Sequence, residues 1–341
     1  MKETLVLTRS DTADLLGWDE CIAAVEGAFR LHAEGRSLPP AVLGVRAPGG
    51  GFHTKAAGLS LRRPYFAVKT NANFSENPAR HGLPAIQGVI VLFDAGNGFP
   101  LAVLDSIEVT IRRTAAATAV AAKYLARPDS SAVGVCGCGN QGRAQLRALA
   151  RVLPLERAYA YDADPERARS YAREMSAALD LDVAAVETVA EAAAGSDVCV
   201  TCTPSRRALL FAEQVRPGTF VAAVGADSAD KQELDPRLMA RGTVVADVLE
   251  QCAAIGDLHH AIAAGVLASD TVHAELADVV AGRKPGRRGP REITIFDSTG
   301  TAIEDVAAAA VVYEKAIERG AGLRVALGAW PARQGAVGPH T

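Results

Sequence analysis

The sequence predicts an α/β protein in which a doubly wound parallel sheet is joined to a second, mostly antiparallel α+β domain. Two observations lead to this prediction. Strands and helical segments alternate regularly from Ala132 onward, and the first third is rich in short apolar or β-branched runs broken by Gly and Pro. The chain has 341 residues, of which 49% are hydrophobic, so it is long enough to bury a sizeable core in two domains.

The first third is expected to contain two helices with short strands between them. The first helix spans residues 19–34, and an alanine-rich helix spans residues 109–126. Arg127-Pro128-Asp129 follows as a helix breaker, and we take it as the domain boundary. Between the helices, five runs have the composition of strands: 42–46, 51–57, 65–73, 86–94 and 101–105.

The remainder of the sequence, after Asp129, predicts parallel strands connected by crossover helices. A last helix over residues 303–319 is alanine-rich in its first half, so we expect it to be buried and to return to the first domain. The expected division is a first domain over 1–127 with 303–330 returning, a second domain of alternating strands and helices over 128–302, and a tail over 331–341. The alternating segments are strands at 132–136, 158–161, 198–202, 219–224, 244–247 and 293–297, with helices at 141–152 and 165–179.

A glycine-rich turn connects the first of these strands to its helix. Gly137, Gly139 and Gly142 form a G-x-G-x-x-G motif that encloses Asn140 and Gln141. The first glycine permits a tight turn, the second lets the backbone approach a pyrophosphate, and the third lets helix pack on strand. The motif therefore predicts a Rossmann domain that binds a dinucleotide.

An acidic residue after the next strand indicates which dinucleotide is bound. Asp162 lies twenty positions after Gly142, where a carboxylate accepts a hydrogen bond from the ribose 2′-hydroxyl of NAD. The same carboxylate repels a 2′-phosphate, so NAD is expected, and Arg167 and Arg169 nearby leave NADP possible.

The residues expected to act on a substrate are an aspartate and several cations. Asp227 follows an apolar strand, which makes it a candidate proton-transfer group or, alternatively, a helix N-cap. Cations in apolar or glycine-rich surroundings indicate an anionic ligand such as a carboxylate, although each could instead be a surface charge or an internal ion-pair partner. These cations are Arg46, Lys55, Lys69 and the pair Arg112-Arg113.

Several separated motifs resemble the ornithine cyclodeaminase/mu-crystallin family, and the likeness runs in order along nearly the whole chain. They are Leu101-Ala102-Val103-Leu104-Asp105, Arg113-Thr114-Ala115-Ala116, Ala121-Ala122-Lys123-Tyr124-Leu125-Ala126, Val224-Gly225-Ala226-Asp227 with Lys231-Gln232-Glu233-Leu234, and Phe296-Asp297-Ser298-Thr299-Gly300.

The resemblance implies a homodimer in which the first domain (1–127 with 303–330) binds the substrate and forms the dimer interface, while the second (128–302) binds NAD. It also implies a role for each matching residue. Lys69 and Arg113 would bind the substrate carboxylate with Arg46 as a third cation, Thr299 would lie near the substrate, and Asp227 would transfer the proton, with Lys69 as a second catalytic candidate. Besides the three glycines, the residues implied to contact the cofactor are Arg113, Asn140, Gln141, Asp162, Thr203, Val224, Gly225, Lys231 and Ser298.

One departure from the family bears on the substrate. Cyclodeaminases carry a glutamate in a short E-x-M-P motif that holds the second amine of a diamino acid. Here His53-Thr54-Lys55-Ala56 stands in its place, and no acidic residue lies between Arg46 and Glu76. His53 and Lys55 suit a neutral or acidic side chain better than an ammonium, unless they only line a strand face.

Three functions follow from these features. The first is an NAD-dependent amino-acid dehydrogenase or imine reductase acting at the α-carbon of a small amino or imino acid. The second is an ornithine cyclodeaminase, which uses NAD without net turnover, and the third is a ligand-binding protein like mu-crystallin.

Composition argues against other classes. The net charge of −3 gives no footprint for nucleic acid, and no leader or long apolar run indicates a membrane, so a cytoplasmic location is expected. Cys199 and Cys202 form a C-x-x-C within a strand-like run, where side chains three apart point to opposite faces, so no metal site is expected.

Overall fold

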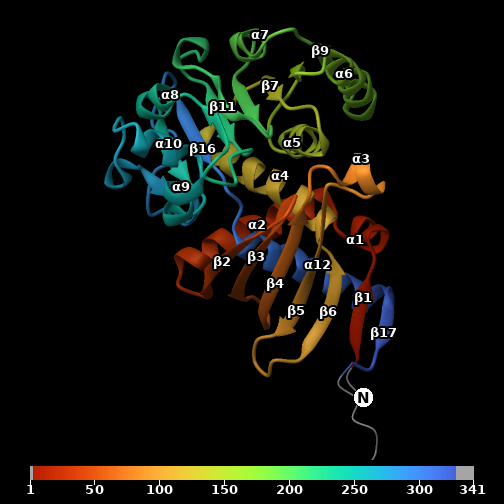
Figure 1. The fold of residues 1–341 in the computed structure, drawn as a ribbon. Helices are drawn as coiled ribbons and strands as arrows, with labels where there is room; N and C mark the ends of the chain where they lie inside the picture. The colour runs from red at the N-terminus through yellow and green to blue at the C-terminus, as the bar shows by residue number, and fades with distance from the viewer. Residues whose placement is uncertain (1–2, 328–341) are drawn as a thin grey trace, which may run out of the picture.

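The computed structural model describes residues 3–327, and two large sheets organise them. In Figure 1 one sheet lies in the lower half of the molecule and the other in the upper half. Both predicted sheet types are confirmed, because the first sheet is mostly antiparallel and the second is entirely parallel. The predicted tail over 331–341 lies outside the described residues.

The first sheet has seven strands. Neighbouring strands are antiparallel except for the parallel pair β1 and β6. Their spatial order is β17 (Leu323–Val325), β1 (Thr4–Leu7), β6 (Pro100–Asp105), β5 (Ile86–Asp94), β4 (Pro64–Asn73), β3 (Gly50–Ser60) and β2 (Ser37–Ala47).

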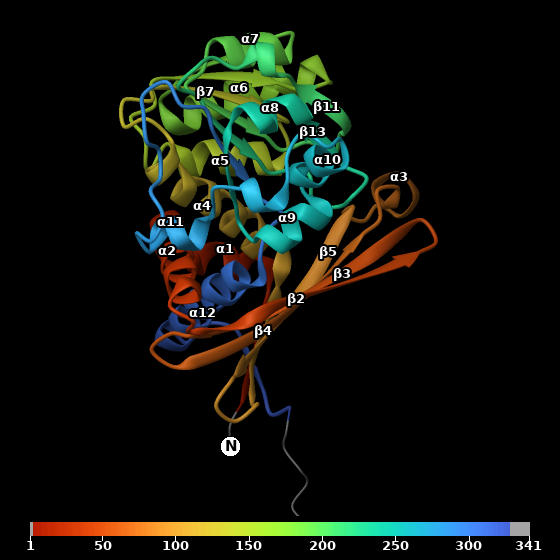
Figure 2. The ribbon, with the colours of Figure 1, turned by 90° about the vertical axis from the view of Figure 1, so that its left-hand side faces the viewer.

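Helices cover one face of this sheet and leave the other face bare, as Figure 2 shows. The helix α12 (Ala302–Arg319), from the end of the described chain, packs against β3, β4 and α2 (Trp18–Ala33). The short helices α1 (Arg9–Leu15) and α3 (Asn77–His81) complete this half. The last helix therefore returns to the first sheet.

The second sheet has eight parallel strands. From β7 the chain first adds β8 and β9 on one side and then crosses to β10 on the other, which is the point where ligands bind in doubly wound folds. The strand order is β15 (Ala274–Glu275), β14 (Thr243–Ala246), β16 (Thr294–Asp297), β12 (Phe220–Ala223), β10 (Val198–Thr201), β7 (Ala132–Cys136), β8 (Arg157–Tyr161) and β9 (Asp182–Ala185).

Helices and a small sheet surround these strands. The helices are α5 (Asn140–Leu149), α6 (Pro165–Leu179), α7 (Val189–Ala194), α8 (Pro236–Arg241), α9 (Leu249–Ile255), α10 (Asp257–Ala263) and α11 (Leu276–Val280). A parallel pair of strands, β11 (Arg206–Leu210) and β13 (Gln232–Leu234), lies beside them. None of the helices in the described part of the chain is long and apolar enough to cross a membrane.

The helix α4 (Ser106–Leu125) follows the first sheet in the chain and leads into the second. It packs against α2 and α12 on one side and against α5 on the other. Its middle is a run of buried alanines, which allows helices to approach closely from several directions. One continuous apolar core consequently extends from the first sheet through α4 into one face of the second sheet.

Element boundaries follow local signals that differ slightly from those expected. The helix expected over 109–126 begins at Ser106, because the Asp105 carboxylate accepts hydrogen bonds from the backbone N–H groups of Ile107 and Glu108. The strands β1 and β17 and the helix α1 were not expected, because each is too short to show a clear period.

Candidate active site

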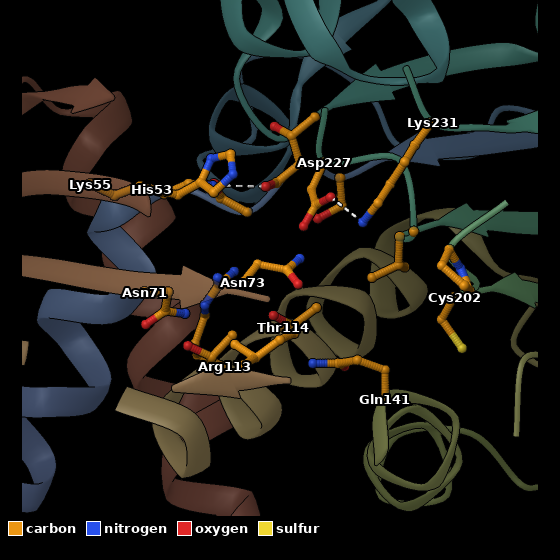
Figure 3. A pocket seen from close by; sticks show the side chains of 18 of the residues that line it. His53, Lys55, Asn71, Asn73, Arg113, Thr114, Gln141, Cys202, Asp227 and Lys231 are labelled. Atoms are coloured by element: carbon orange, nitrogen blue, oxygen red, sulfur yellow. Dashed lines mark hydrogen bonds and ion pairs between the residues drawn. The ribbon is translucent and has the colours of Figure 1, made fainter. Parts of the chain in front are cut away.

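A cavity of about 300 Å³ lies between the helix-covered face of the first sheet and the carboxyl ends of the strands of the second sheet. Strands β3 and β4 contribute one wall, α4 contributes another, and α5 with the loops after β10, β12 and β16 closes the third side. Figure 3 shows His53, Lys55 and Asn71 on the strand side and Gln141, Cys202 and Lys231 opposite them.

The glycine turn has the geometry that its sequence predicts. Gly137 has a φ of 108°, which disfavours any residue with a side chain. A Cβ on Gly142 would lie 2.1 Å from the Gly137 carbonyl oxygen, so only glycine allows α5 to begin this close to β7. A Cβ on Gly139 would meet nothing within 4 Å, so the space in front of the turn is open.

The open turn and the cavity fit a dinucleotide. No side chain caps the N-terminus of α5, so its first backbone N–H groups remain available to a pyrophosphate. The buried Oε1 atom of Gln141 has no hydrogen-bond partner and lies at the cavity. Asp162 follows β8, and its carboxylate accepts a hydrogen bond from the backbone N–H of Cys138.

A buried carboxylate that sequence reasoning missed shapes the cofactor side of the cavity. Glu233 accepts hydrogen bonds from the backbone N–H and the hydroxyl of Thr203, and from the backbone N–H of Gly225. Burial raises its pKa to about 7, with a further upward contribution from Asp257, although the hydrogen bonds from Thr203 act in the opposite direction. Glu233 thus holds together the loops that follow β10 and β12.

Two cations and two carboxylates form a buried cluster at the inner end of the cavity. Lys69 Nζ lies 2.7 Å from Asp305 Oδ2, and Arg113 Nε lies 2.9 Å from Asp305 Oδ1. Arg113 Nη1 also lies 2.8 Å from Glu304 Oε2. All four side chains are at most 5% exposed, so these ion pairs are shielded from water.

Burial shifts the titration of this cluster toward neutral pH. It lowers the pKa of Lys69 to about 7, aided by the positive charge of Arg113 and partly opposed by Asp305. Burial also raises the pKa of Glu304 to about 7, although Arg113 opposes the shift. For Asp305, the effect of burial is outweighed by Lys69 and Arg113, which lower its pKa. The cluster can therefore gain or lose a proton near neutral pH.

A third buried cation lies beside the cluster. Lys55 is paired with Lys69 across β3 and β4, and its Nζ donates hydrogen bonds to the carbonyl oxygens of Thr299 and Gly300 at 3.0 and 2.7 Å. Burial and the charge of Arg113 lower its pKa. Lys55 therefore connects the first sheet to the loop that follows β16.

Asp227 lies on the opposite side of the cavity with Lys231. Lys231 Nζ donates to the Asp227 carboxylate at 2.6 Å, and the Asp227 side chain is 56% exposed. Partial desolvation by the surrounding protein acts to raise its pKa, but Lys231, Lys55 and His53 outweigh this effect and lower it. The carboxylate is therefore ionised at neutral pH and accessible from the cavity.

The structure brings most of the sequence-derived candidates to this one cavity. Two of the cations do not line it. Arg46 is exposed near the end of the edge strand β2, and Arg112 lies over the Trp18 ring and pairs with Glu108. Asp162 and the glycines Gly137, Gly139 and Gly142, together with Asn140, lie at the adjoining turn rather than in the cavity wall. The candidates that line the cavity are His53, Lys55, Lys69, Arg113, Gln141, Thr203, Val224, Gly225, Asp227, Lys231, Ser298 and Thr299.

Comparison with known proteins identifies the family. The model of the ornithine cyclodeaminase/mu-crystallin family matches residues 2–320. The chain belongs to this family. Several solved structures also superpose on this chain, and the three described next cover 94–95% of it.

Three of these solved structures are of enzymes that bind a nicotinamide dinucleotide. An archaeal alanine dehydrogenase dimer with bound NAD is 39% identical, with a TM-score of 0.91 over 95% of this chain and 99% of its own. The Thermococcus litoralis Δ1-pyrroline-2-carboxylate reductase, in complex with NADH and L-proline, is 37% identical, with a TM-score of 0.90 over 94% and 100%. The Paracoccus denitrificans iminosuccinate reductase, in complex with NAD+, is 34% identical, with a TM-score of 0.88 over 95% and 100%.

The buried cluster predicts a pH-dependent effect of Asp305→Asn. Asp305 raises the pKa of Lys69, so its loss lowers that pKa below about 7 and leaves less of the ammonium at neutral pH. We expect KM for a carboxylate substrate to rise by roughly tenfold, which corresponds to about 1.4 kcal/mol. The fall of kcat/KM with rising pH should also begin at a lower pH than in the unmodified protein.

The measurement is the pH profile of kcat/KM, with thermal unfolding recorded to verify folding. Glu318→Gln is the matched control, because Glu318 is an exposed carboxylate on the same helix. An unchanged pH profile in folded Asp305→Asn would contradict the assigned coupling.

Proposed function

We propose that the protein is an NAD-dependent oxidoreductase that interconverts a small amino acid and the corresponding imino acid at the α-carbon. The observation that supports this most directly is the placement of two buried cations, Lys69 and Arg113, across one cavity from the ionised Asp227. Cations at one end suit a carboxylate, and a proton acceptor at the other suits an amine.

In this proposal the protein orients the substrate from both ends. Lys69 and Arg113 hold the α-carboxylate, while Asp305 and Glu304 fix the two cations from behind. The glycine turn before α5 and Asp162 would hold NAD, which would supply the hydride transfer at the α-carbon in either direction.

Asp227 moves the proton. Its lowered pKa keeps the carboxylate ionised at neutral pH, so it is able to accept a proton from the amine in the oxidative direction and to return it to nitrogen in the reductive direction. Lys231, hydrogen-bonded to the same carboxylate, stabilises the charged form. The loop after β12 thereby positions both groups beside the cofactor side of the cavity.

A cyclodeaminase acting on a diamino acid is the second candidate, and the cavity lining argues against it. A distal ammonium calls for a carboxylate on the strand wall, where the structure has His53, Lys55, Lys69 and Asn71. Asp227 is the acidic residue among those that line the described cavity, and it is already paired with Lys231.

The third candidate is a binding protein that catalyses no reaction. Such a protein would not need the pair of Asp227 and Lys231.

An assay at 340 nm tests the proposal. NADH should be consumed stoichiometrically with a 2-oxo acid and ammonia, because these form an imine in solution. Asp227→Asn should lower kcat by roughly 10²–10⁴-fold, the usual contribution of acid–base catalysis, while NADH affinity stays within a few-fold.

Asp230→Asn, on the same loop, serves as the control and should retain activity. Near-normal turnover in Asp227→Asn would remove Asp227 from the mechanism. Formation of proline and ammonia from ornithine without net change in NADH would instead establish the cyclodeaminase.

We also propose that the protein is a homodimer formed through the bare face of the first sheet. Five large apolar side chains on that face are exposed: Leu38, Leu43, Val45, Phe52 and Val89. An exposed apolar face of this kind is typical of an interface between protein chains. The archaeal alanine dehydrogenase described above is a dimer, which supports this proposal.

Val45→Asp should disrupt this interface, because it would bury a charge between the first sheets of the two subunits. Light scattering is expected to give twice the chain mass of 35.4 kDa for the unmodified protein and a lower mass for the variant. Val266→Asp, at an exposed valine beside the second sheet, should remain dimeric. A monomeric unmodified protein would rule out the interface.

The division into a substrate and dimerisation domain and a dinucleotide domain belongs to the same proposal. It is supported by the two sheets and by the packing of α12 on the first of them. A cytoplasmic location is also proposed, and the unpaired state of all six cysteines is consistent with a reducing compartment.

A further inference from the structure

The strand wall of the cavity is arranged in rows, which follow from the pairing of β3, β4 and β5. Lys55, Lys69 and Ile90 form the innermost row, and His53, Asn71 and Gly88 form the next row outward. Residues two apart on a strand share a face, and the rows are about 7 Å apart along β4. The cavity therefore changes from buried ammonium and guanidinium groups at its inner end to imidazole and amide groups farther out.

The second wall, α4, repeats this order. Arg113 belongs to the inner cluster. Thr110 lies about 4.5 Å from it along the helix axis toward the N-terminus of α4, and Ser106 lies about one turn beyond Thr110 in the same direction. Ser106 contacts Asn71, so the outer rows of both walls meet. A ligand held by its carboxylate at Lys69 and Arg113 thus extends its side chain toward Asn71 and Thr110.

The amide of Asn71 is fixed with its N–H groups free. The Ser106 hydroxyl donates to Asn71 Oδ1 at 2.6 Å, which leaves Nδ2 available as a donor at the cavity. Gly88 makes room for this pair, because a Cβ there would lie 2.3 Å from Asn71 Oδ1 and 2.7 Å from Ser106 Oγ. The position of the amide therefore depends on three separate elements, β4, β5 and α4.

Thr110 adds a hydroxyl without a partner. Its Oγ1 is buried and makes no hydrogen bond in the described structure, although the residue lines the cavity. An apolar substrate side chain would leave this hydroxyl and the Asn71 amide unsatisfied, which is costly for desolvated polar groups. An oxygen acceptor on the substrate would satisfy both.

Charge favours an anionic acceptor over a neutral one. Lys55, Lys69, Arg113 and Lys231 line the cavity, with Asp227 as the carboxylate among the described lining residues. Glu304 and Asp305 offset Lys69 and Arg113 from behind, and Asp227 offsets Lys231. Lys55 has carbonyl oxygens as its hydrogen-bond partners and no ion pair within residues 3–327.

We propose that Asn71, oriented by Ser106 and joined by Thr110 and His53, selects a substrate whose short side chain ends in a carboxylate. The substrate class is then a 2-imino dicarboxylic acid of four or five carbons and its amino product. This inference rests on the proposed function. In the reductive step, NADH gives its hydride to the imine carbon, one proton is added to nitrogen, and NAD and the amino dicarboxylic acid are released.

The test compares oxaloacetate with 2-oxobutyrate, each with ammonia and NADH, because a methyl group in the second replaces the distal carboxylate of the first. The unmodified protein should show at least a ~10-fold higher kcat/KM with oxaloacetate, equivalent to about 1.4 kcal/mol. Asn71→Leu should reduce this ratio by about tenfold, and Ser106→Ala should reduce it in the same direction but less. Asn77→Leu, the same substitution outside the cavity, should leave the ratio within twofold.

Two results would overturn the inference while leaving the proposed function intact. One is a preference of the unmodified protein for 2-oxobutyrate, and the other is an equal loss of activity with both substrates in Asn71→Leu. If no 2-oxo acid consumes NADH, the proposed function fails, and calorimetry with NAD present decides the inference separately. Tighter binding of L-aspartate than of L-2-aminobutyrate would then support the selectivity, and equal binding would refute it.

Discussion

The buried ion-pair cluster around Asp305 is the interaction on which the rest of the site depends. It joins β4 of the first sheet, the connecting helix α4 and the last helix α12 through Lys69, Arg113 and Glu304. Charges this well shielded remain in the interior only when each has a partner. The ion pairs that hold these three elements together also fix two cations at the inner end of the cavity.

The second sheet contributes its groups by a different route. Because its strands are parallel, their carboxyl ends meet at one edge, and the loops after β10, β12 and β16 reach the same space, with the turn after β7 adjoining it. Glu233 then holds two of these loops at a fixed separation. The reacting groups therefore come from rigid elements on one side and from tethered loops on the other.

The sequence was sufficient to predict both sheets and the residues whose role follows from local pattern. Gly137, Gly139 and Gly142 are determined by a turn, and Asp227 by its position after a strand, so each could be located without tertiary information. Arg46 was chosen for its glycine-rich surroundings and for the family resemblance, and the structure does not bring it to the cavity.

The groups that were missed depend on contacts between distant segments. Glu304 and Asp305 begin an alanine-rich helix, where acidic residues ordinarily favour the helix dipole, so their pairing with Lys69 and Arg113 is not visible in sequence. Two carboxylates within a helix expected to be buried were nevertheless a usable signal, because burial requires partners. Asn71 gave no such signal, since its orientation depends on Ser106 and Gly88 from other elements.

The position of α12 in the chain has a consequence for how the protein acquires its site during synthesis. Translation releases the Rossmann strands and the whole strand wall of the cavity before residues 302–319 emerge. Until then, Lys69 and Arg113 lack the carboxylates that balance them in the folded protein. The inner end of the cavity therefore cannot form before the last helix has been synthesised, because that helix supplies Glu304 and Asp305.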